Sequence, residues 1–205
     1  MQIRRFNLPS IMPAFKDVLG RLGYNKKRTE LSDIAFTAVE NCLEYSLNFI
    51  HPLGNTVEDE ITEKSSSVVK ISCGIEFRSE KLSKILINSK KLTLMACTIG
   101  NQLKNEIERL EKDGDITRAV ILDAIASEAA EAFANYITGV LEREKIMLGL
   151  RPTMRFSPGY GDLKTDVHLK MLPVLESESI GISFNKENFI LYPEKSITAL
   201  TGWEK

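Results

Sequence analysis

One uninterrupted helical stretch, from Ile116 to about Ile146, constrains this sequence more than any other feature. A turn signal, Asp113-Gly114-Asp115, precedes it, and Gly139 is the one helix-weakening residue within it. Apolar residues recur at helical spacing and form one stripe: Leu122, Ile125, Ala126, Ala129, Phe133, Tyr136, Ile137 and Val140. We therefore predict one long amphipathic helix over about 116–146, the longest of the fold.

The opposite face of this predicted helix is unusual because it holds small residues around one carboxylate. Its members are Val120, Ala124, Ser127, Glu131, Ala134 and Thr138. Small side chains allow another backbone or a ligand to approach closely, so Glu131 is a candidate site residue.

The rest of the chain mixes helices and strands without regular alternation. Apolar spacing predicts a buried strand over 91–98 and helices over 11–22, 32–49, 101–112 and 163–175, with Met12 and Ile34 inward. Weaker strand signals lie at 55–75, 180–184, 189–192 and 196–201. This order favours an α+β fold with a largely antiparallel sheet, and no repeat or long linker divides the single predicted domain, 1–205.

Composition excludes several classes of protein. The chain is 43% hydrophobic and 27% charged, which argues against a disordered tail or a coiled-coil rod. Its 27 Lys+Arg and 28 Asp+Glu leave a formal net charge of -1, so no global field attracts nucleic acid or an anionic membrane. Three widely spaced cysteines form no disulfide framework, and the longest uncharged run contains Pro52 and Gly54. We expect a cytoplasmic protein without a membrane span.

The usual catalytic motifs are missing. The pair Gly159-Tyr160-Gly161 lacks the third glycine of a dinucleotide-binding loop, and no phosphate loop or His-Glu-x-x-His motif occurs. His51 and His168 are expected to be surface or capping residues. Cys97 lies in an apolar strand, where burial would raise the pKa of its thiol, so no cysteine nucleophile is expected.

A short sequence, Asp166-Val167-His168, is similar to the start of the loop that places histidine beneath cobalt in corrinoid-binding domains. Met171 stands where that loop requires glycine. We therefore expect the chain to hold no corrinoid of its own.

One loop, residues 151–162, concentrates residues suited to binding a small carboxylate. It contains two arginines, two prolines, two glycines and a tyrosine. Arginine offers a bidentate fork to a carboxylate, proline fixes the loop, and glycine lets a ring approach the main chain. Tyrosine adds an aromatic face and a hydroxyl. On composition alone, a plain turn after a long helix remains the alternative.

Three segments resemble the activation domain of cobalamin-dependent methionine synthase. They are Arg155-Phe156-Ser157-Pro158-Gly159-Tyr160, Ala130-Glu131-Ala132-Phe133-Ala134, and the stretch from Tyr192 to Trp203 with its Pro-x-x-Ser pattern. The resemblance extends from about Lys90 to Trp203 and is weak up to about residue 89.

This resemblance implies a twisted antiparallel sheet flanked by helices and a site for S-adenosylmethionine. The implied binding residues are Glu131, Arg155, Ser157, Gly159 and Tyr160, with no catalytic or metal-binding residue. The implied function is reductive remethylation of the cobalamin of a separate corrinoid protein. The implied partners are a cobalamin-dependent methionine synthase, as that corrinoid protein, and a flavodoxin- or ferredoxin-like protein that supplies electrons.

Two departures and two alternatives accompany this interpretation. An acidic site residue near the start of the family domain has no match here, and the tail that carries another site tyrosine does not follow Trp203. The chain could instead be a non-catalytic S-adenosylmethionine-binding regulator or chaperone, or a structural interaction subunit of a corrinoid enzyme. Whether it acts as an enzyme stays open at this point.

Overall fold

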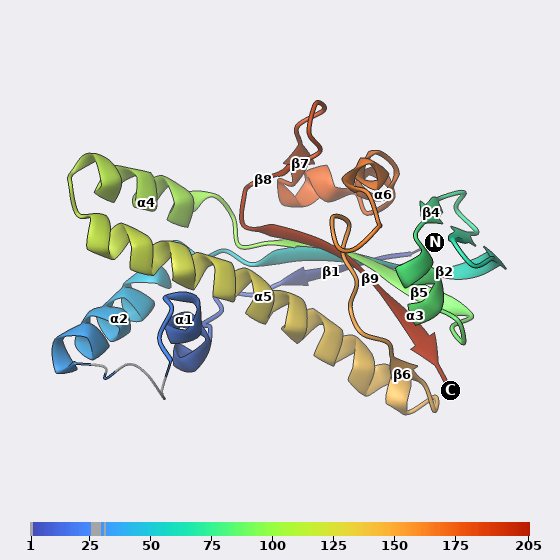
Figure 1. Cartoon of the computed structure of the whole chain (residues 1–205), viewed down its shortest axis with the longest axis horizontal. Coiled ribbons are helices and arrows are strands. Elements are labelled where there is room, and N and C mark those ends of the chain that lie inside the picture. Colours follow the sequence, from blue (N-terminus) through green and yellow to red (C-terminus); the bar gives the residue numbers. More distant parts are fainter. Residues whose placement is uncertain (1, 26–29, 31) are drawn as a thin grey trace.

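A central sheet determines where the other elements lie (Figure 1). The structure, a computed structural model, describes residues 2–25, 30 and 32–205. Within these residues, seven strands form one sheet in the order β4-β3-β2-β5-β9-β6, with β1 also paired to β2, and all these pairs are antiparallel. The strands are β1 (Ile3–Asn7), β2 (Leu53–Lys64), β3 (Val68–Ile71), β4 (Glu76–Arg78), β5 (Lys91–Thr98), β6 (Arg151–Pro152) and β9 (Ser196–Glu204).

Strand β5 lies between β2 and β9 and has the bounds predicted from its apolar run. All of its residues except Lys91 are buried. Leu94 lies opposite Val57 of β2 and Leu200 of β9, and each of these three residues is at most 1% exposed. The middle of the sheet is therefore packed on both faces, as a run without polar alternation requires.

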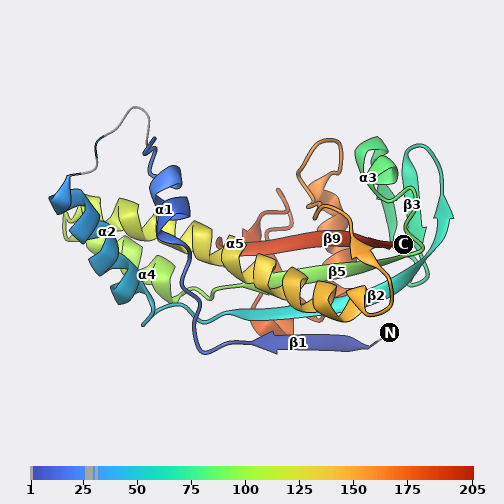
Figure 2. The same ribbon diagram turned by 90° about the horizontal axis from the view of Figure 1, so that it is seen from below.

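The long helix α5 (Ile116–Ile146) has the predicted bounds and covers one face of the sheet (Figure 2). Its C-terminal half packs on the strands through Phe133 and Ile137, which meet Met95, Ala199 and Trp203. Its N-terminal half packs against three other helices. These are α1 (Phe15–Arg21), α2 (Asp33–Ser46) and α4 (Gln102–Lys112).

Shorter elements cover the opposite face of the sheet. They are α6 (His168–Val174), two 3-10 turns (Thr165–Val167 and Ser177–Ile180) and the hairpin of β7 (Ser183–Phe184) and β8 (Leu191–Tyr192). Met171, Leu175 and Ile182 pack there on Val57 and Leu94. Helix α3 (Glu80–Ile85) lies against β3 and adds Leu82 and Leu86 to the same core.

The predicted α+β fold with a largely antiparallel sheet is confirmed. The helix predicted over 101–112 is α4, and the strand-like region 55–75 holds β2 and β3. Ser32 caps α2, since its hydroxyl accepts a hydrogen bond from the Ala35 N–H at 3.3 Å. Among the helices of the described residues, none combines the length and the apolar character needed to cross a membrane.

Three predictions about the helices were wrong. Helix α1 is shorter than the predicted span 11–22, because Pro13 disfavours a helical backbone at Met12, which is 50% exposed. Ile34 lies in the first turn of α2 and is 84% exposed rather than inward. Tyr136 is 40% exposed, so the buried stripe of α5 is narrower than predicted.

The region after Gly149 also differs from the prediction. Only the second half of 163–175 is α-helical. Between 180 and 184, Gly181 adopts a φ of 75° and ends a 3-10 turn, so only two residues remain for β7. Strand β9, by contrast, continues beyond the predicted 196–201 to Glu204 because β5 pairs with it as far as Trp203.

Candidate functional site

The predicted binding loop begins as an extra strand on the edge of the sheet. Phe156 and Leu200 exchange backbone hydrogen bonds of 2.9 and 2.7 Å, so this part of the loop runs extended beside β9. Successive residues of an extended strand point to opposite faces. Phe156 is 8% exposed and belongs to the core that contains Met171 of α6. Arg155 consequently faces the side of the sheet that α5 covers.

Two predicted site residues, Arg155 and Glu131, form an ion pair. Arg155 Nη2 contacts Glu131 Oε2, and Arg155 Nη1 donates to Asn135 Oδ1 at 3.1 Å. The Arg155 side chain is 18% exposed and that of Glu131 is 39% exposed. The guanidinium is thus held in place, while the carboxylate can be reached from solvent. A fixed cation beside an accessible anion complements the two charges of an α-amino acid.

Glu131 is part of a row of polar side chains along α5, which we call the polar row. The polar row consists of Asp123, Ser127, Glu131 and Asn135. Its neighbouring members are four residues apart, so helical geometry places them along one side of α5. Ala124 and Ala134, small residues predicted to surround Glu131, are only 5% and 0% exposed. They therefore face neighbouring protein, whereas Val120 at the start of this face is 54% exposed and the Glu131 side chain is 39% exposed.

Lys195 brings a second cation to the polar row, and sequence reasoning missed it. Its Nζ lies 2.8 Å from Asp123 Oδ1 and donates to Ser127 Oγ at 3.1 Å, and its side chain is 11% exposed. Ile197 and Ala199 follow at two-residue spacing and pack in the core shared with α5. This alternation is the signal that could have placed Lys195 on the helix side of the strand.

The other three predicted residues lie in a turn after Phe156. The Tyr160 N–H donates to the Ser157 carbonyl at 3.1 Å, and the Gly159 N–H donates to the Leu163 carbonyl at 2.8 Å. Gly159 has a φ of 92°, which favours glycine, and Tyr160 is 64% exposed. The structure therefore pairs Arg155 with Glu131 directly and places Ser157, Gly159 and Tyr160 in the adjoining turn.

This turn borders an open surface depression of about 640 Å³, which Arg155 and Glu131 do not line. The depression is lined by Gly159, Gly161, Asp162, Leu163, Lys164, Thr165, Asp166 and Phe189. Its wall combines glycine backbone with charged side chains and one aromatic ring. The backbone of the turn is therefore accessible to a small molecule.

Two side chains with potential catalytic chemistry are buried. Burial raises the pKa of the Cys97 thiol to about 12, in agreement with the prediction that it is no nucleophile. The expectation that His168 is a surface or capping residue is wrong, because it is 4% exposed. Its Nδ1 lies 3.0 Å from the Phe189 carbonyl and its Nε2 lies 2.8 Å from Thr198 Oγ1. Burial lowers the pKa of His168, which joins α6 to β9. Over the described residues, no three His, Cys, Asp or Glu side chains gather as metal ligands.

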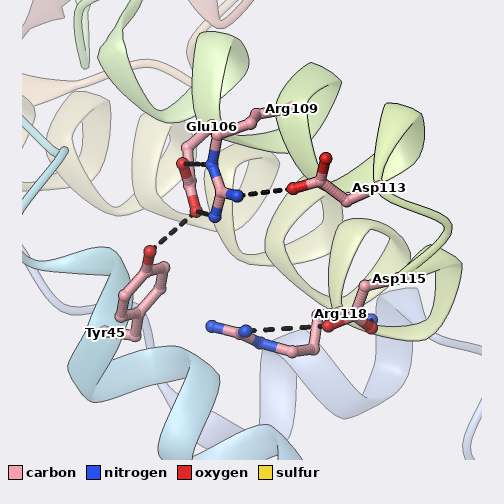
Figure 3. A network of polar contacts seen from close by, with 6 residues as sticks. All are labelled: Tyr45, Glu106, Arg109, Asp113, Asp115 and Arg118. Atoms are coloured by element: carbon pink, nitrogen blue, oxygen red, sulfur yellow. Dashed lines mark hydrogen bonds and ion pairs between the residues drawn. The ribbon is translucent and has the colours of Figure 1, made fainter.

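A separate polar network connects α2, α4 and α5 (Figure 3). Tyr45 donates to Glu106 at 2.7 Å, and Arg109 donates to the same carboxylate at 2.8 and 2.9 Å and to Asp113 at 2.6 Å. Hydrogen bonds from the Arg109 guanidinium lower the pKa of Glu106 to about 2. Arg118 of α5 lies over the Tyr45 ring, 4.9 Å from its centroid. These groups satisfy one another, so the network holds helices together.

Comparison with known proteins finds a solved structure with a similar fold. No protein-family model and no curated protein matches the sequence. Among solved structures, the chain is similar to one described as the crystal structure of the MetH reactivation domain bound to AdoHcy, that is, S-adenosylhomocysteine. The TM-score is 0.71 at 15% sequence identity, and the match covers 98% of this chain and 78% of that chain. The predicted resemblance is therefore confirmed at the level of the fold.

Proposed function

We propose that this chain binds S-adenosylmethionine and supports reductive remethylation of the cobalamin of a separate corrinoid protein. One observation carries the proposal: the paired charges of Arg155 and Glu131 lie at the predicted loop, in a fold similar to a domain solved with S-adenosylhomocysteine. Each residue also belongs to a segment that carries the sequence resemblance.

The amino-acid end of S-adenosylmethionine has the charges that this pair can satisfy. Arg155 would bind the carboxylate through its fork of N–H donors, and Glu131 would bind the ammonium. Binding would break the Arg155–Glu131 ion pair and form two ion pairs with the ligand, one at each side chain. Since the Glu131 side chain is 39% exposed, this exchange leaves the buried core in place.

Ser157, Gly159 and Tyr160 would line the adenosine. The missing side chain of Gly159 lets a ring approach the backbone, and the exposed Tyr160 offers an aromatic face and a hydroxyl. With the amino acid at Arg155 and the adenosine at the turn, the sulfonium would lie between them. Its methyl group would face the partner.

The work required of this chain is to bind and orient the methyl donor. The partner's cobalamin, reduced by one electron from cobalt(II) to cobalt(I), would accept the methyl group of S-adenosylmethionine, and S-adenosylhomocysteine would leave. Holding the reactants aligned replaces a bimolecular encounter, and the donor's orientation depends on the Arg155 pair and the turn. We place the partner and a flavodoxin- or ferredoxin-like electron donor in the cytoplasm with this chain.

A remethylation assay tests this function. The purified chain is mixed with a corrinoid protein in the cobalt(II) state, S-adenosylmethionine and a low-potential reductant, and methylcobalamin is followed by its visible absorbance. We expect conversion that stops when the reductant, S-adenosylmethionine or this chain is omitted. Conversion at the same rate without this chain would contradict the proposal. Tight ligand binding without conversion by any corrinoid protein would instead favour a non-catalytic S-adenosylmethionine sensor.

A further inference from the structure

The turn that carries Ser157, Gly159 and Tyr160 is fixed at both of its ends. On one side, Phe156 is joined to β9 by its two backbone hydrogen bonds with Leu200. On the other side, the carboxylate of Asp162 reaches α3, which lies 82 residues away in the sequence. The intervening residues, 157–161, therefore span two fixed points.

The contact with α3 is a chain of hydrogen bonds. Asp162 Oδ1 accepts from the Ser79 hydroxyl at 2.5 Å, and Oδ2 accepts from the Glu80 N–H at 2.6 Å. Ser79 Oγ in turn accepts from the Leu82 N–H at 3.0 Å, which caps α3. The hydrogen bond from Ser79 lowers the pKa of Asp162. The carboxylate is therefore ionised at neutral pH, where its hydrogen bonds are strongest.

The groups that Asp162 contacts, Ser79 and the start of α3, adjoin the core of the protein. Ser79 is 3% exposed, while Leu82 of α3 and Leu86, directly after α3, are 0% and 1% exposed. These two leucines pack in the same core as Leu94 of β5. Asp162 thus connects an exposed turn to a helix that packs on the sheet through buried leucines.

The backbone at Gly161 has a φ of 60°, which favours glycine. A Cβ atom added to it would meet only the exposed, flexible side chain of Lys81, 2.6 Å from Cδ, which can move aside. Gly159, two residues earlier, also has a positive φ. Tyr160 therefore lies between two glycines with positive φ, and the hydrogen bonds of Asp162 to Ser79 and Glu80 help to maintain their conformations.

We propose that Asp162 is a positioning residue for ligand binding: its hydrogen bonds to Ser79 and Glu80 hold the 157–161 turn in the shape that receives adenosine. This inference rests on the proposed function. A loop ordered during folding binds more tightly than one that the ligand must order, because fixing backbone dihedrals costs conformational entropy. Asp162 acts through the turn and does not itself contact the ligand.

Calorimetric titration with two ligands tests this role. S-adenosylhomocysteine carries both the amino acid and the adenosine, whereas 5′-methylthioadenosine lacks the amino acid. We expect Asp162→Ala to weaken both ligands by roughly 10-fold, the equivalent of one lost ordering interaction. Asp162→Asn should give intermediate affinities because its amide oxygen can still accept from the Glu80 N–H. Ser79→Ala should also weaken both ligands, although Ser79 is buried.

Asp59 provides a matched control. Its carboxylate also accepts from a serine hydroxyl, that of Ser72, and from a backbone N–H, that of Cys73 at 2.8 Å. Asp59→Ala should lower the melting temperature and leave both affinities unchanged. In Asp162→Ala, hydrogen exchange should accelerate at the amides of 159–161 while the amides of β5 keep their protection.

Three outcomes would overturn the inference. Equal affinities for the wild type and Asp162→Ala would refute the positioning role and leave the proposed function standing. Weakening in the Asp162 variants but not in Ser79→Ala would mean that Asp162 contacts the ligand directly. A wild-type chain that binds neither ligand would overturn the proposed function and this inference together.

Discussion

Gly54 of β2 marks a point where α5 crosses the sheet at close range. A Cβ atom added to Gly54 would lie 2.7 Å from Ile137 Cδ1 and 3.2 Å from Cys97 Cβ. Both neighbours are 0% exposed, so neither can turn into solvent. Replacement of Gly54 by alanine must therefore displace α5 or force a side chain out of its preferred rotamer.

The expected cost of Gly54→Ala is about 1–2 kcal/mol in the free energy of unfolding. Overpacking a core costs roughly 1–3 kcal/mol. The stiffer unfolded chain of the alanine variant offsets about 0.4–1 kcal/mol of this cost. For a chain of this length, the net loss corresponds to a fall of roughly 2–8 °C in melting temperature. Urea denaturation followed by circular dichroism measures it.

Ile137→Val supplies the second half of a double-mutant cycle, because it deletes the Cδ1 atom that the added methyl group would strike. Alone, Ile137→Val should cost about 0.5–1.5 kcal/mol through lost packing. In its presence, Gly54→Ala should cost about 1 kcal/mol less than in the wild type. Gly20→Ala is the control, since Gly20 lies in α1 with no atom near its added Cβ, and it should not destabilise. An identical cost of Gly54→Ala in both backgrounds would refute the assigned contact.

Three further outcomes follow from the site and the helix network. Glu131→Gln should weaken S-adenosylmethionine binding with little change in melting temperature. Glutamine can still accept a hydrogen bond from Arg155, but it carries no charge to attract the ligand's ammonium group. A lower melting temperature with unchanged affinity would show that Glu131 has a structural role. Lys195→Met should lower the free energy of unfolding by about 1 kcal/mol, measured in urea, because the segment just before β9 loses its contacts with Asp123 and Ser127. Equal stability would exclude this role. The pKa of Glu106 in the folded protein, about 2, lies below its ordinary value of 4.5, so its stabilisation is complete above about pH 4.5 and is lost as pH falls toward 2. As pH is lowered toward 2, the free energy of unfolding should therefore fall more steeply in the wild type than in Glu106→Gln. Parallel curves for the two proteins would contradict the contact with Arg109.

The parts of the fold that sequence predicted well are those with strong local signals. The bounds of α5 and β5 agree with prediction, because a long periodic run and an uninterrupted apolar run each determine one element without help from distant residues. Glu131 was predicted from its small-residue helix face and Arg155 from the composition of its loop, and both lie in segments that carry the family resemblance. The structure adds that the two side chains touch.

The parts that sequence reasoning missed depend on contacts between distant segments. Lys195 joins the polar row only because β9 lies beside α5, and its contact with Asp123 spans 72 positions of the sequence, from 123 to 195. Asp162 meets α3 across a similar separation. His168 lies in a charged segment typical of the surface, yet α6 turns it inward against Thr198. Local periodicity can indicate the face of a strand on which a residue lies, but it does not identify the distant residue that it contacts.

Calorimetric titration of S-adenosylmethionine into the wild type and Arg155→Ala tests the central claim most directly. We expect saturable binding to one site in the wild type and a roughly 10- to 100-fold loss of affinity in the variant, as for a lost charge-assisted hydrogen bond of about 1.5–3 kcal/mol. The variant should still fold, because the Arg155–Glu131 pair is partly exposed and such pairs contribute only about 0–1 kcal/mol to stability. Equal affinity in the two proteins, or no saturable binding in the wild type, would contradict the assignment of this site.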